Sequence, residues 1–83
     1  MTDNEQNSIW KSVLEYVYER TTEAAFKLWI TPLKFYGTED GVAYIASDKE
    51  FCNNVVKQGY DKLLKDAFFC VTGEQVEIAY CEK

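Results

Sequence analysis

Residues 22–36 read TEAAFKLWITPLKFY, and within them the spacing of apolar residues changes from that of a helix to that of a strand. Thr22 followed by Glu23 suits a helix start with an acidic first turn. Pro32 cannot continue a helix and should push Thr31 toward an extended conformation. We therefore predict a short helix that ends at Pro32. Its apolar face consists of Ala25, Phe26, Trp29 and Ile30.

A first helix is predicted upstream of this segment. Asn7 or Ser8 can cap it, since a short oxygen side chain accepts the unpaired amide hydrogens of a first turn. Its apolar stripe consists of Ile9, Trp10, Val13, Leu14 and Val17. Residues 1–7 have no apolar side chain after the first methionine and are expected to be flexible. Residues 8–83 then form a single domain.

A period of two after Pro32 predicts a β-hairpin. Leu33 and Phe35 lie on one face of its first strand, residues 38–41 form the turn, and residues 42–46 form the second strand. Gly41 supplies the positive φ that closes the turn. We assign every glycine of the chain to a turn: Gly37, Gly41, Gly59 and Gly73.

A third helix should begin at residues 47–50, SDKE, which form a capping box of serine and, three residues later, glutamate. Gly59 stops or bends this helix. Residues 60–68 carry the helical spacing onward, either as a separate helix or as a kinked continuation, and residues 76–80 alternate as a final strand. The apolar stripe after the capping box consists of Phe51, Cys52, Val55 and Val56.

The expected order is helix, helix, strand, strand, helix (or two helices), strand. Three strands covered on one face by helices give a two-layer α+β domain with a three-stranded sheet.

Composition and charge limit the function. The chain has nine basic and fourteen acidic residues, which give a net charge of −5. Strong binding to nucleic acid through phosphate contacts is therefore not expected. The chain has no apolar run long enough to cross a membrane, and its first residues do not resemble a signal peptide. We expect a cytoplasmic protein that does not bind membranes and whose partner is another protein.

Cysteine and histidine usage argue against a metal site or an active site. The chain has no histidine, and Cys52, Cys70 and Cys81 have no metal-ligand spacing, so we expect three reduced thiols that serve as small core residues. No histidine-assisted nucleophile and no phosphate-binding glycine loop occurs. We therefore expect no catalysis, no metal and no cofactor.

The side chains add a more specific pattern, Phe26-x-x-Trp29-Ile30-x-Pro32-Leu33. Other elements in matching order are Trp10, Phe51 after an acidic residue, Tyr60, and Thr72-Gly73-Glu74. With these residues the chain, from about Ile9 to Tyr80, resembles the N-terminal domain of the bacterial chromosomal replication initiator DnaA.

This resemblance implies a KH-like fold and a non-catalytic interaction domain. Such a domain associates weakly with itself, helps recruit the replicative helicase to the opened origin, and docks regulators of initiation. ATP binding and recognition of origin boxes belong to later domains of the intact initiator. A likeness of architecture alone, without this function, is a further alternative.

The resemblance also implies site residues. Trp10, with Ile9 beside it, matches the self-association surface, although Trp10 could equally complete the core stripe of the first helix. Phe51 matches an aromatic residue that contacts helicase or regulators, although it could pack in the core one turn before Val55. Glu50 and Cys52 flank Phe51, and Trp29 is expected beside the same surface.

Two features depart from the family pattern. An acidic helicase contact precedes the motif phenylalanine in the family, but Ala25 stands there, and Glu23 lies about 200° away around a helix. The helicase surface is therefore built differently or binds more weakly. A KH domain also grips phosphates with a G-x-x-G loop, which is missing here. The alternative function, weak binding of single-stranded DNA, would use lysines such as Lys34, Lys49 and Lys57.

Overall fold

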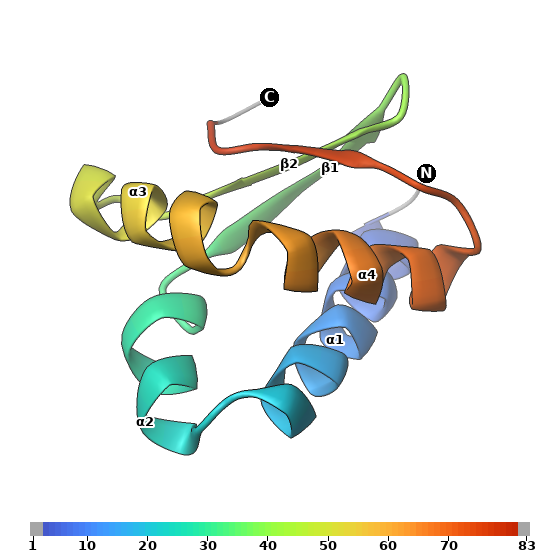
Figure 1. Ribbon diagram of the computed structural model, residues 1–83. Coiled ribbons are helices and arrows are strands. Elements are labelled where there is room, and N and C mark those ends of the chain that lie inside the picture. The colour runs from blue at the N-terminus through green and yellow to red at the C-terminus, as the bar shows by residue number, and fades with distance from the viewer. Residues whose placement is uncertain (1–2, 82–83) are drawn as a thin grey trace.

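A computed structural model describes residues 3–81, with side chains from Asn7 onward, and residues 1, 2, 82 and 83 lie outside the described residues. The predicted α+β class and element order are confirmed (Figure 1). In chain order the elements are α1 (Asp3–Arg20), α2 (Glu23–Ala25) with its π-helical continuation η1 (Phe26–Ile30), β1 (Lys34–Glu39), β2 (Val42–Ala46), α3 (Glu50–Gly59), α4 (Asp61–Thr72) and β3 (Glu77–Ala79).

The three strands form one mixed sheet in the order β1-β2-β3. β1 and β2 pair antiparallel through a tight hairpin, whereas β2 and β3 pair parallel. A parallel pair needs a long crossover connection, and α3 and α4 supply it. In Figure 1 the helices lie on one side of the sheet, which gives two layers.

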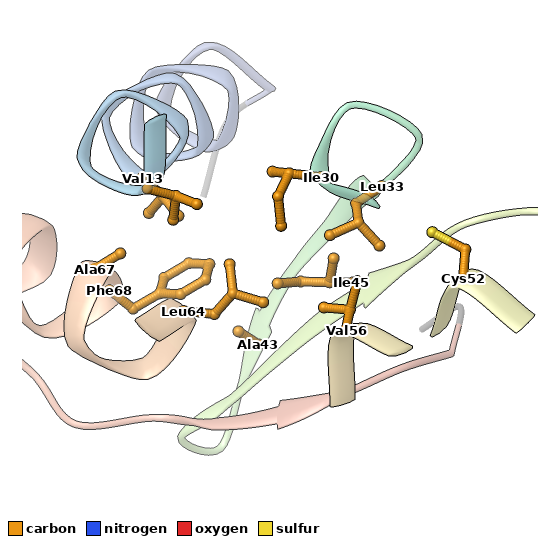
Figure 2. Close-up of a cluster of buried hydrophobic side chains, with 11 residues drawn as sticks. Val13, Ile30, Leu33, Ala43, Ile45, Cys52, Val56, Leu64, Ala67 and Phe68 are labelled. Carbon is orange, nitrogen blue, oxygen red and sulfur yellow. The ribbon is translucent and has the colours of Figure 1, made fainter. Parts of the chain in front are cut away.

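The core fills the space between these layers, and all of its buried side chains among the described residues are apolar. Figure 2 shows side chains from the helices and from β2 pointing toward one another. The cluster comprises Val13, Val17, Ile30, Leu33, Ala43, Ile45, Cys52, Val56, Leu64, Ala67 and Phe68. Every helix of more than three residues thus contributes to a single core.

The first helix is longer than predicted. It begins at Asp3, so the expected start at Asn7 or Ser8 is wrong. Apolar periodicity marks only the part of a helix that packs on a core, and residues 3–7 contain no apolar side chain. The periodic stripe itself is confirmed, because Val13 and Val17 are fully buried.

The second helix begins as predicted but ends differently. The Thr22 hydroxyl accepts a hydrogen bond from the Ala25 N–H at 3.1 Å and caps α2. Thr31 is helical, with φ −55° and ψ −38°, not extended. Its N–H and hydroxyl both donate to the Phe26 carbonyl, at 2.9 and 3.3 Å, and these bonds outweigh the steric preference of a residue before proline. The helix ends at Ile30, two residues before Pro32.

One glycine has a different role from the one predicted. The turn of the hairpin is confirmed at Asp40 and Gly41, which both have positive φ, 53° and 77°. Thr38 and Glu39, predicted to lie in the turn, instead form the end of β1 and pair with β2. Gly37, however, lies inside β1, where the register shifts between Phe35 and Gly37, and has φ 108°. A bulge and a turn can both require positive φ, so a glycine alone does not distinguish them.

The predicted capping box does not form. α3 begins at Glu50, and no side chain caps it at Lys49. Asn53 instead hydrogen-bonds both backbone groups of Ser47, accepting from its N–H at 2.7 Å and donating to its carbonyl at 3.2 Å. An amide can do both, whereas a glutamate carboxylate can only accept.

α3 and α4 are separate helices, which settles the alternative left open by Gly59.

Only Cys52 of the three cysteines is buried, whereas Cys70 and Cys81 are exposed, contrary to prediction. The inward stripe of α4 is Leu64, Ala67 and Phe68, and Cys70 lies off it. The Cys70 thiol contacts the Tyr16 phenol and raises its pKa.

A polar contact holds the short strand β3 against α4. The Tyr80 hydroxyl donates to Asp61 at 2.8 Å, and the Lys65 ammonium lies 3.1 Å from Asp61 and 3.0 Å from Glu77. Burial, together with the hydrogen bond to Asp61, raises the pKa of the Tyr80 phenol far above its usual range. The bonds to Glu77 and Asp61 raise the pKa of Lys65.

Because folding favours the protonated forms of Tyr80 and Lys65, the unfolding free energy should be steady at neutral pH and should fall above about pH 10, where the unfolded groups lose their protons. Tyr80→Phe should cost about 1.5 kcal/mol at neutral pH and flatten the alkaline decline. Denaturant unfolding between pH 7 and 11 measures both effects. An equally steep decline in Tyr80→Phe would contradict this assignment.

Candidate protein-docking surface

The start of α3 lies beside η1. The Cys52 thiol donates to the Trp29 carbonyl at 3.3 Å, and the rings of Trp29 and Phe51 lie 5.9 Å apart at an angle of 53°. Side chains from two separate segments are therefore brought together, as the resemblance led us to expect for Trp29 and Phe51.

Large apolar side chains on these two elements are exposed. Phe51 is 71% exposed and Leu28 is 60% exposed, whereas Trp29 is half-buried. We call Trp29 and Phe51 the aromatic patch. Phe51 is outside the core because Cys52 and Val56, one turn apart, form the inward face of α3. The alternative that Phe51 packs in the core is therefore wrong.

The other residues expected at this surface have different environments. Glu50 is exposed beside Phe51, but Cys52 is buried, so it positions Trp29 and cannot itself be reached by a partner. Glu23 is exposed and pairs with Lys27 at 3.2 Å. Ala25 is half-buried in α2.

The sequence patterns did not identify Leu28 as an exposed apolar residue. It lies one residue before Trp29 and off the predicted apolar stripe of the second helix. A large apolar residue off a helix's inward stripe is a usable signal for an exposed apolar surface, and Leu28 carried that signal.

Trp10 is partly packed inside the domain and is not a fully exposed side chain. Its ring stacks on Phe35 at 5.5 Å and on Phe68 at 6.3 Å, with angles of 24° and 28° between the planes. Trp10 and the neighbouring Ile9 are both half-buried against the core. Both therefore contribute to packing as well as to the surface of α1.

The lysines considered for nucleic acid lie on separate elements. Lys34 is at the start of β1, Lys49 precedes α3, and Lys57 is in the last turn of α3, all of them exposed. Within residues 3–81, no cluster of three or more acidic, cysteine or histidine side chains could hold a metal ion. In the same range, none of the helices is long and apolar enough to span a membrane.

The described residues thus define a small α+β domain that presents an exposed aromatic surface. A family model for the DnaA N-terminal domain matches residues 7–69. The chain belongs to this family.

Individual relatives agree. The chromosomal replication initiator protein DnaA of Thermodesulfovibrio yellowstonii is 32% identical over 77 residues, which cover 93% of this chain and 18% of that protein. The DnaA proteins of Deinococcus deserti and Flavobacterium psychrophilum are 28% and 29% identical over 87% and 88% of this chain, and over 16% and 15% of their own length. The chain spans less than a fifth of these relatives.

The different packing of Trp10 and Phe51 should appear in stability. Trp10→Ala should lower the unfolding free energy by about 3 kcal/mol, because it removes a ring stacked on two others. Phe51→Ala should lower it by less than about 1 kcal/mol, because most of the ring is already in water. Chemical denaturation of both variants compares them, and equal losses would mean that Phe51 is a core residue in solution.

Proposed function

We propose that this chain is the non-catalytic interaction domain of a chromosomal replication initiator in the cytoplasm. It would help recruit the replicative helicase and would dock regulators of initiation, while ATP binding and origin-box recognition would lie in other domains of an intact initiator. The observation that carries the proposal is the exposed Phe51 ring supported by Trp29, in a member of the DnaA N-terminal domain family.

The aromatic patch has the properties of a binding hot spot. Large rings contribute much of the energy of protein interfaces when a partner removes them from water. Phe51 is held by its contact with Trp29, and η1 is held to α3 by the Cys52 hydrogen bond, so little order has to be gained on binding. Rigid support with an exposed tip favours docking of a preformed pocket on the partner.

Charge beside the patch supports the same role. Ala25 provides no carboxylate where the family has an acidic residue, and the Glu23 carboxylate is already paired with Lys27. Glu50 is the exposed carboxylate adjacent to Phe51 in the chain. In our proposal Glu50 takes the place of the acidic contact and orients a basic group of the helicase or regulator.

Weak self-association is proposed at α1, through Trp10 and Ile9. Both side chains are half-buried, so each keeps some surface that a second copy could cover. The exposed area of two such residues is small, and a small interface gives a weak dimer.

The helicase proposal is tested with Phe51→Ala and a matched control, Phe69→Ala. Phe69 is also an exposed phenylalanine, at 49%, but it lies on α4 outside the aromatic patch. Phe51→Ala should weaken binding to the replicative helicase of the same organism by a factor of about thirty. Phe69→Ala should leave binding unchanged. Calorimetric titration gives both affinities, and circular dichroism checks the folds.

Equal affinity of the original chain and Phe51→Ala for the helicase would remove the patch from the contact. Equal losses in both phenylalanine variants would point to a general surface effect instead.

Self-association is tested with Trp10→Phe, which keeps an aromatic ring against Phe35 and Phe68 but makes the side chain smaller. Sedimentation velocity at increasing concentration should show weaker dimerisation of the variant, while its unfolding free energy changes by less than about 1.5 kcal/mol. An original chain that stays monomeric throughout, or an equally strong variant dimer, would refute the role of Trp10.

A further inference from the structure

A second apolar surface lies between α1 and η1, apart from the aromatic patch. It is a shallow groove of about 370 Å³. Its lining includes Tyr18, which is 49% exposed and meets the Phe26 ring edge-on at 5.1 Å and 89°. The groove is lined by Lys11, Leu14, Glu15, Tyr18, Glu19 and Phe26.

The shape of the groove suits a helix. Its α1 residues follow the helical spacing of three and four, from Lys11 to Glu19. They therefore form a straight stripe of about two turns, roughly 12 Å long. The ridge of a second helix can pack into such a stripe, with apolar side chains against Leu14 and Tyr18.

The charges on the rim are unequal along the groove. Lys11 lies at one end, Glu15 lies at the middle, and Glu19, which pairs with Arg20 at 3.7 Å, lies at the other end. The whole chain also carries a net charge of −5. A basic partner is therefore favoured over most of the groove, and a single acidic group is favoured at the Lys11 end.

We propose that this groove binds an amphipathic helix of another protein, with an apolar stripe flanked by lysine and arginine. A second copy of this chain fits less well. Glu15 is at the middle of the stripe, so a two-fold contact would place it against its own counterpart, between two acidic molecules. The groove would then bind a partner independently of the aromatic patch, so one domain could hold two proteins at once.

The test uses the 83-residue chain labelled with nitrogen-15 and two synthetic helical peptides. Both peptides carry the same leucine stripe, and their flanks are lysine and arginine in one and glutamate in the other. The basic peptide should shift backbone amide signals between Lys11 and Glu19 and at Phe26. The acidic peptide should bind at least about tenfold more weakly.

Charge reversal makes the test specific. The double variant Glu15→Lys with Glu19→Lys should bind the basic peptide at least about tenfold more weakly and should bind the acidic peptide more tightly. The control, Asp48→Lys with Glu74→Lys, makes the same change of net charge at two exposed positions outside the groove and should bind as the original chain does. Tyr18→Ser should weaken binding of either peptide, and Phe51→Ala should not.

Three results would overturn the proposal. The first is equal affinity for both peptides, or signal changes away from α1 and η1. The second is an equal loss of binding in the control variant, which would show a nonspecific effect of net charge. The third is concentration-dependent dimerisation of the original chain that Tyr18→Ser abolishes, which would assign the groove to a second copy.

Discussion

Three aromatic rings join the two layers of this domain. Trp10 of α1 stacks on Phe35 of β1 and on Phe68 of α4, and Phe35 and Phe68 lie 5.5 Å apart. A triangle of rings from three elements sets the distance between helices and sheet, because aromatic rings fill a large volume and have few rotamers. Of these three rings, Phe68 is fully buried. Trp10 and Phe35 are partly buried and pack against the core cluster to which Phe68 belongs.

Because Trp10 packs against Phe35 and Phe68, it offers less surface for binding other molecules. A ring that holds α1 to the sheet offers only its remaining edge to a partner. The more exposed apolar side chains lie elsewhere, at Phe51 on α3, at Leu28 on η1 and at Tyr18 in the groove of α1. They lie on different elements and have different neighbouring charges, which is the basis for proposing two kinds of partner.

Much of the fold could be predicted from local patterns. The change of period at Pro32 located the boundary between helix and strand, Thr22 capped its helix, and Gly41 closed the hairpin. The errors arose where two structures share one local signal. Gly37 was expected in a turn because glycine allows positive φ, but it lies at a β-bulge. The expected capping box of Ser47 and Glu50 does not form, and the Asn53 side chain instead hydrogen-bonds both backbone groups of Ser47.

The candidate surface, too, could be predicted only in part from the sequence. Periodicity and residue type alone establish an acidic α+β domain with bulky rings on short helices, since these depend on the order of residues along the chain. These sequence patterns leave open which ring is exposed to solvent, because Trp10 and Phe51 each belong to a predicted apolar stripe that could pack in the core. That outcome depends on packing: Cys52 and Val56 occupy the inward face of α3 and leave Phe51 outside, whereas Phe35 and Phe68 meet Trp10 from elements distant in sequence.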